Sequence, residues 1–165
     1  MSETAVAVNP KGIFNRRTKG QRLDPVKVQV ERGRIQFFAQ VLGETDPIHL
    51  DLASARAKGF PDVVAPPSYF TVIDAASNEE RRRRGEPAVA TLVNCDFRYL
   101  LHGDETYEYL GPIFAGDEVT LTTTIADFYD KKGGDMEFVT FVSVLEHVTR
   151  GVLVRATRNL LHRLA

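Results

Sequence analysis

Two carboxylates and an imidazole lie within six residues of one another, at Glu44, Asp46 and His49. An unperturbed histidine has a pKa of about 6.5, so it can accept or donate a proton near neutral pH. A nearby carboxylate can orient the ring or share the proton transfer. Pro47 removes one backbone donor and fixes its own φ, which stiffens the loop between these side chains. The segment 43–49 is therefore a candidate acid/base site.

The same residues also have a purely structural explanation. Asp46 can cap the helix that follows it, and His49 can be a half-buried polar residue whose ring is satisfied by hydrogen bonds. Helix caps are common and catalytic pairs are rare, so seven residues alone favour the structural explanation.

A longer stretch around this segment resembles a known enzyme signature. Residues 37–39 and 42–49 are similar to the pattern of the MaoC-like dehydratases and enoyl-CoA hydratase 2 enzymes, which runs aromatic, Ala, Gly, Asp, any residue, Asn, Pro, aliphatic, His. Residues 100–109 and 116–117 resemble the dehydratase branch related to fatty acid synthase and mycolic-acid dehydratase subunits. Together the similarity spans residues 26–162.

This sequence departs from the family pattern at two positions. Glu44 stands where the pattern has its catalytic Asp, and Asp46 stands where it has Asn, whereas His49 matches directly. The resemblance implies that His49 is the principal acid/base residue. Its carboxylate partner is Glu44 by alignment position, or Asp46 by chemistry. Several non-catalytic partner subunits of this branch lack the His, so its presence favours an active site.

The resemblance implies reversible hydration of an enoyl thioester, or dehydration of a 3-hydroxyacyl thioester, carried on coenzyme A or acyl carrier protein. The thioester oxygen needs hydrogen-bond donors, and helix N-termini supply unpaired N–H groups. Pro66 and Pro67 have no N–H, so the expected donors at the start of the central helix are Ser68 or Tyr69; Ser68 can instead be a plain N-cap. Pro47 is a further expected substrate-contacting residue. No metal or other cofactor is expected.

Two other functions remain open. The Glu44 and Asp46 changes leave room for a non-catalytic acyl-binding subunit of a heteromeric dehydratase. Related hotdog proteins hydrolyse acyl-CoA with a carboxylate, for which Asp74 or Glu79 would be the candidates here. The arginine run 81–84 is expected to be a solvated helix end, or else a contact for phosphates of coenzyme A or an acidic carrier.

Composition limits the remaining classes of function. A chain of 165 residues, 43% of them hydrophobic, fits one domain. With 21 Lys and Arg against 22 Asp and Glu, the net charge of -1 gives no general attraction to nucleic acid or an acidic membrane. No apolar stretch approaches the roughly 20 residues of a membrane-spanning helix. The single Cys95 cannot form an internal disulfide, and no leader pattern opens the chain, so we expect a cytoplasmic protein.

Hydrophobic periodicity predicts helices first and then strands. We expect a short strand at 26–30 and helices at 31–42, 52–58 and 67–80. The expected later strands are 88–97, 106–110, 119–128, 137–147 and 152–161. This order predicts an α+β fold with a mainly antiparallel sheet on a central helix. It is similar to a single hotdog domain, here residues 25–165, preceded by a flexible or docking arm at 1–24. Such domains pair through sheet edges, as a homodimer or as a heterodimer with another hotdog subunit.

Overall fold

The structure, a computed structural model, describes residues 9–165. In chain order its helices and strands are β1 (Val26–Gln29), α1 (Arg32–Leu42), α2 (Leu52–Ala57), α3 (Phe70–Arg83), α4 (Val89–Leu92), β2 (Leu100–Tyr109), β3 (Glu118–Lys131), β4 (Met136–His147) and β5 (Gly151–Arg163). Short 3-10 turns lie at η1 (Arg16–Thr18), η2 (Pro47–His49), η3 (Pro67–Tyr69) and η4 (Lys132–Gly134).

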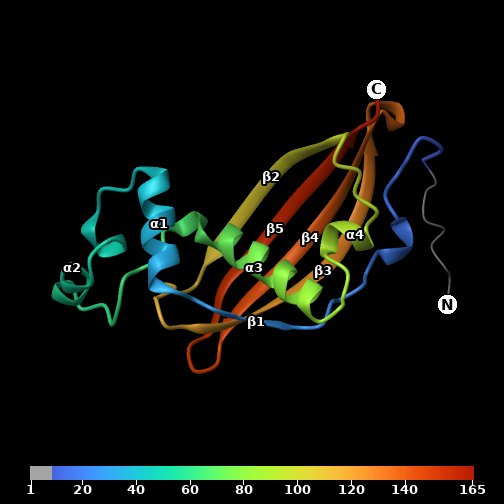
Figure 1. The fold of residues 1–165 in the computed structure, drawn as a ribbon. Helices are drawn as coiled ribbons and strands as arrows, with labels where there is room; N and C mark the ends of the chain where they lie inside the picture. Colours follow the sequence, from blue (N-terminus) through green and yellow to red (C-terminus); the bar gives the residue numbers. More distant parts are fainter. Residues whose placement is uncertain (1–8) are drawn as a thin grey trace.

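The five strands form one antiparallel sheet in the order β1-β3-β4-β5-β2. Helix α3 runs across this sheet, and α1 and α2 lie beyond its N-terminal end (Figure 1). The predicted α+β architecture, with an antiparallel sheet on a central helix, is confirmed. The segment that carries the candidate acid/base residues lies between α1 and α2.

The main core lies between α3 and the sheet. Phe70 and Ile73 of α3 are buried in one cluster with Leu121 of β3, Leu145 of β4 and Val154 of β5. Burial of one such side chain contributes about 1.5–3 kcal/mol. Strands β3, β4 and β5 supply these residues because alternate side chains of a strand point to the same face. The start of α3 is thereby fixed against the sheet.

Residues 9–24 of the expected flexible or docking arm pack on the rest of the protein. Phe14 and Leu23 are buried in a second core cluster with residues of β3, β4 and β5. The N–H groups of Ile13 and Phe14 donate to the buried carboxylate of Glu137, at 2.7 and 3.0 Å. Residues 1–8 of the expected arm lie outside the described residues.

The strand expected at 88–97 is wrong, because α4 and a turn occupy this stretch. Val89 and Val93 are four residues apart and both are buried, so a helical turn places them on one face. Asn94 then adopts φ of 54°, a conformation that ends the helix. Alternating apolar residues here reflect one helical turn packed on the second core.

The arginine run also differs from expectation at its first member. Arg81 is only 5% exposed. Its guanidinium pairs with Glu86 at 2.8 Å and donates to the carbonyl of Asp24. Arg81 therefore ties the end of α3 to the chain that enters β1, and it is not part of a solvated end.

Candidate active site

Helix α1 ends in a geometry that places Glu44 directly after its last turn. Gly43 has φ of 74°, in the left-handed region that favours glycine. Its N–H donates to the carbonyl of Gln40 at 3.1 Å, and the N–H of Glu44 donates to the carbonyl of Ala39 at 2.9 Å. These two bonds satisfy two of the last four carbonyls of the helix. The predicted helix end at Gly43 is confirmed.

Asp46 caps the short turn that carries His49. Its carboxylate accepts from the N–H of Ile48 at 3.1 Å, and the ammonium of Lys58 lies 3.1 and 3.3 Å from its two oxygens. The Ile48 N–H, then Lys58 and a smaller attraction from His49, hold the pKa of Asp46 below its usual value. The structural explanation therefore accounts for Asp46. Pro47 follows as the exposed first residue of the turn.

His49 is buried, with 9% of its surface exposed. Its Nδ1 lies 2.6 Å from the carbonyl oxygen of Val64. A carbonyl oxygen can only accept, so Nδ1 must carry the proton in this bond. In the neutral ring Nε2 then has a free lone pair, and this nitrogen is the one that can accept a proton.

The segment around Val64 holds the His49 turn in place. The N–H of Val64 donates to the carbonyl of Ile48 at 3.0 Å, so Val64 bonds to the turn through both its N–H and its carbonyl. Residues 63–65 pair in turn with 113–115, through N···O distances of 2.8 and 3.1 Å. Val64 acts through its main chain, so its side chain gives no signal in the sequence.

Glu44 has a different environment from Asp46. Its side chain is half-buried, and within residues 9–165 its carboxylate makes no hydrogen bond or ion pair. Of the two carboxylates near His49 in sequence, Glu44 is therefore the one that is not committed to a structural contact.

Of the two residues expected to bind the thioester oxygen, Ser68 and Tyr69, only one has a free backbone N–H. The N–H of Tyr69 donates to the carbonyl of Pro66 at 2.9 Å, so it is not free to bind a substrate oxygen. The Tyr69 ring is 2% exposed and meets the ring of Phe38 edge-on, and burial raises the pKa of its phenol. Ser68 is exposed and makes no capping hydrogen bond, so it is not the N-cap. Only the Ser68 N–H remains available as the expected donor.

Asp74 and Glu79, the carboxylates considered for a thioesterase, lie on α3 and not in the segment 43–49 that carries His49. Asp74 is buried on α3, where its carboxylate lies 3.0 Å from the guanidinium of Arg158. Both line a cavity of about 350 Å³ between α3, α4 and the sheet. A carboxylate paired in this way has a structural partner already. His102 lies on β2 with 73% of its side chain exposed.

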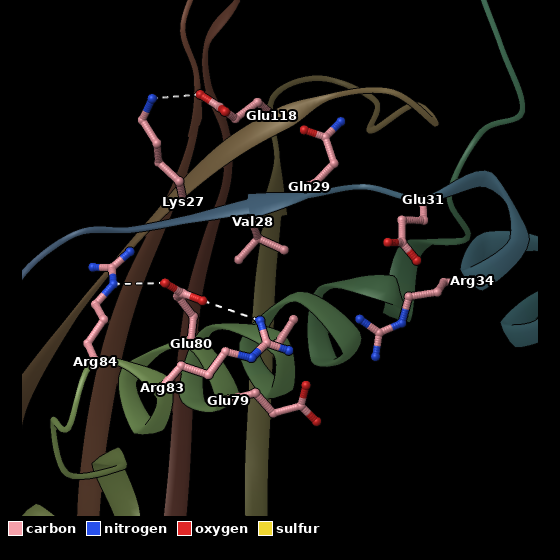
Figure 2. A pocket seen from close by; sticks show the side chains of 11 residues that line it. Lys27, Val28, Gln29, Glu31, Arg34, Glu79, Glu80, Arg83, Arg84 and Glu118 are labelled. Atoms are coloured by element: carbon pink, nitrogen blue, oxygen red, sulfur yellow. Dashed lines mark hydrogen bonds and ion pairs between the residues drawn. The ribbon is translucent and has the colours of Figure 1, made fainter.

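Glu79 lines a groove of about 400 Å³ between β1 and α3 (Figure 2). The groove contains many charged side chains, with equal numbers of positive and negative ones. The lining residues include four cations and four carboxylates: Lys27, Arg34, Arg83, Arg84, Glu31, Glu79, Glu80 and Glu118. Figure 2 shows Glu80 between Arg83 and Arg84, to which it bonds at 3.3 and 3.0 Å. This balance does not favour a phosphate site at the arginine run.

Two other expectations concern metals and membranes. Within the described part of the chain, no group of three His, Cys, Asp or Glu side chains could hold a metal ion. None of the helices in residues 9–165 is long and apolar enough to cross a membrane.

The sequence matches one known protein family over most of its length. The family model described as FAS1-like, dehydratase domain region matches residues 17–157. The chain belongs to this family. Similar proteins include the UPF0336 protein of Streptomyces griseus, which is 34% identical over 66% of this chain and 68% of that protein. The UPF0336 protein of Thermobifida fusca is 30% identical over 82% of this chain and 87% of its own length.

Solved structures confirm the hotdog fold. The 3R-hydroxyacyl-ACP dehydratase complex HadBC of Mycobacterium tuberculosis superposes with a TM-score of 0.68 at 17% identity, covering 87% of this chain and 96% of that chain. A MaoC-like dehydratase of Rhodospirillum rubrum superposes with a TM-score of 0.64 at 23% identity, and the match covers 92% of this chain and 97% of that chain. The ChsH1–ChsH2 complex of Mycobacterium tuberculosis superposes with a TM-score of 0.61 at 21% identity, and the match covers 88% of this chain and 98% of that chain. At this identity these likenesses establish the fold.

Proposed function

We propose that this chain catalyses reversible addition of water to the 2,3 double bond of an enoyl thioester. The observation that carries the proposal is the His49 ring. Its Nδ1 proton is engaged by the Val64 carbonyl, which leaves Nε2 as the proton acceptor on a buried, fixed imidazole. Membership of a dehydratase family supports the same class of reaction. A histidine held in one tautomer is suited to general acid/base chemistry.

The proposed reaction consumes one water molecule, and His49 carries one proton of that water to the substrate. Nε2 of His49 takes a proton from the water whose oxygen bonds to C3 of the substrate. Electrons of the double bond shift toward the thioester carbonyl, whose oxygen becomes enolate-like and needs hydrogen-bond donors. The Ser68 N–H is the proposed donor. His49 then returns the proton to C2, so that H and OH are both added across the double bond. Dehydration is the reverse sequence.

Glu44 is the proposed carboxylate partner, with the role of orienting the water. Asp46 is already bonded to Ile48 and Lys58, and its removal would release the turn that carries His49. Glu44 has no such commitment. The longer Glu side chain at the family's Asp position can therefore serve the substrate directly.

The test is incubation of the purified chain with short and medium enoyl-CoA thioesters, followed by mass spectrometry for addition of one water and by a thiol reagent for free coenzyme A. Glu44→Gln should lower the rate by up to ~100-fold, as expected when a group that holds the attacking water in place is altered. Asp46→Asn keeps the capping oxygen and should retain most activity. Release of free coenzyme A without hydration would instead indicate hydrolysis.

A second candidate is an acyl-binding subunit that works with another hotdog protein. Two of the structural neighbours are heteromeric complexes, HadBC and ChsH1–ChsH2. The edge strand β2 and the residue after it expose large apolar side chains, with Leu101 47%, Tyr109 41% and Leu110 53% exposed. An exposed edge strand of this kind is suited to pairing with a second copy or a different subunit. Folded chain that is inert alone, but active when mixed with a hotdog partner, would favour this function.

A further inference from the structure

A partly buried ionic cluster is centred on Asp117, in the turn that precedes β3, and is not used by the proposed chemistry. The Asp117 side chain is 11% exposed. One of its oxygens accepts from the N–H of Phe114 at 2.8 Å and pairs with the guanidinium of Arg150, and the other lies 3.6 Å from Nε2 of His147. We call Asp117, His147 and Arg150 the Asp117 cluster. Asp117 belongs to the second stretch that resembled the dehydratase branch.

The Asp117 cluster fixes both ends of the turn 112–117. Arg150 donates to the carbonyl of Pro112 at 2.7 Å, and its guanidinium lies over the ring of Phe114, 5.0 Å from the centroid. The chain at Val30 bonds to residues 116 and 117 through two backbone hydrogen bonds of 2.8 Å. The turn is therefore clamped between β1 and the turn that joins β4 to β5.

A single backbone pairing connects this turn to the segment that binds His49, the candidate base. Residues 113–115 pair with 63–65, and Val64 in the middle of that pairing accepts the Nδ1 proton of His49 at 2.6 Å. A displacement of the turn would shift the Val64 carbonyl, and with it the direction in which Nε2 points.

We propose that Asp117 is a positioning residue, and that the Asp117 cluster sets the Val64 carbonyl that fixes the orientation and tautomer of His49. Its consequence for rate rests on the proposed function, whereas its consequence for the His49 ring does not. A misplacement of about 1 Å at a reacting group can lower a rate by about 100-fold. We therefore expect kcat to fall by ~10- to 100-fold in Asp117→Ala, with little change in KM.

The deciding experiment is NMR of the histidine ring protons, recorded with the kinetics. The wild-type Nδ1–H signal of His49 is identified by its loss in His49→Ala. His162 is an internal reference, because its Nδ1 is 2.8 Å from Glu137 and it is fully buried. Asp117→Ala should lose the His49 signal and keep that of His162. Asp117→Asn keeps an acceptor for the N–H of Phe114, so it should show much of the wild-type His49 signal.

Asp127→Asn is the matched control. Asp127 also accepts a neighbouring backbone N–H, from Phe128 at 2.8 Å, and pairs with a lysine at 2.5 Å, but it lies in β3 outside the turn 112–117. It should leave the His49 signal and kcat unchanged. If Asp117→Ala does not fold, Arg150→Met removes the guanidinium and leaves the bond between Asp117 and Phe114.

The outcomes separate the two proposals. Loss of the His49 signal in the cluster variants, with His162 unchanged, supports the positioning role even if wild type proves inactive. An unchanged His49 signal in folded Asp117→Ala and Arg150→Met overturns it, whatever happens to the rate. Equal loss in Asp127→Asn also overturns it, because the effect would then be general destabilisation.

Discussion

Replacing Glu137 with alanine should be among the most damaging substitutions outside the candidate site. Glu137 is fully buried on β4, and one of its oxygens accepts from the N–H groups of Ile13 and Phe14 and from Nδ1 of His162. The guanidinium of Arg16 lies 3.7 Å from its other oxygen. This carboxylate therefore attaches the N-terminal segment to the sheet.

The magnitude follows from the donors that alanine would leave unpaired. A buried donor without an acceptor costs about 1–3 kcal/mol, and breaking a buried ionic pair by removing one partner costs about 3–5 kcal/mol. We expect Glu137→Ala to lower the free energy of unfolding by about 3–5 kcal/mol, a large share of the 5–15 kcal/mol typical of a domain. Glu137→Gln keeps an acceptor oxygen and should lose only about 1–2 kcal/mol.

Urea unfolding followed by circular dichroism measures these differences, since the midpoint moves with stability when the slope is unchanged. Glu118→Ala is the matched control, because Glu118 is an exposed glutamate paired with Lys27 and its removal should change stability by less than about 1 kcal/mol. A loss below about 1 kcal/mol in Glu137→Ala, or equal losses in the Ala and Gln variants, would refute the reasoning.

Three further outcomes can be measured directly. The pKa of Asp46 is lowered in the folded chain, so its stabilising effect should be complete above the ordinary value of 3.8 and be lost as pH falls through the lower folded value. NMR titration should show this, and Lys58→Met should reverse it only in part because the Ile48 N–H remains; a pKa at or above 3.8 in wild type would contradict it. Gly43→Ala should lower the free energy of unfolding by about 1–2 kcal/mol through its φ alone, with Gly43→Asn less affected, and equal stability of all three in urea would count against this. Burial raises the pKa of the Cys95 thiol, so it should react slowly with a thiol reagent at pH 8 until the protein is unfolded, whereas equal rates folded and unfolded would show the thiol to be open.

Local sequence rules predicted the elements whose signals are local. Gly43 ends α1, as expected for a helix at 31–42, and the helix expected at 52–58 forms as α2, where Asp51 accepts from the N–H of Ser54 at 2.7 Å. The expected strands 119–128, 137–147 and 152–161 lie within β3, β4 and β5, whereas 106–110 overlaps only the second half of β2, which begins at Leu100. These features depend on neighbours in the chain, so the sequence alone carries them.

The failures have a common physical cause, which is contact between distant segments. Val89 and Val93 are buried in the second core cluster, so the stretch expected to be a strand is helical. Arg81 is buried because Glu86 and the carbonyl of Asp24 satisfy it. A run of charges gives no sign of which member will find buried partners.

The candidate site was predictable in its residue types but not in its bonding. The pattern identified His49, Glu44 and Asp46, and could not divide the work between the two carboxylates. The contacts of Asp46 with the Ile48 N–H and with Lys58 distinguish it from Glu44, and the Val64 carbonyl fixes the His49 ring. The roles of these residues in catalysis stay a prediction.

The most direct test of the central proposal is the rate of loss of the conjugated double bond of an enoyl-CoA thioester, followed by absorbance. Wild type would be compared with His49→Ala and with His102→Ala, a control that removes an exposed histidine. The proposal predicts that wild type and His102→Ala hydrate the substrate at similar rates, while His49→Ala is ~100-fold slower or worse. A folded His49→Ala variant that keeps the wild-type rate would contradict the assignment of His49 as the acid/base group.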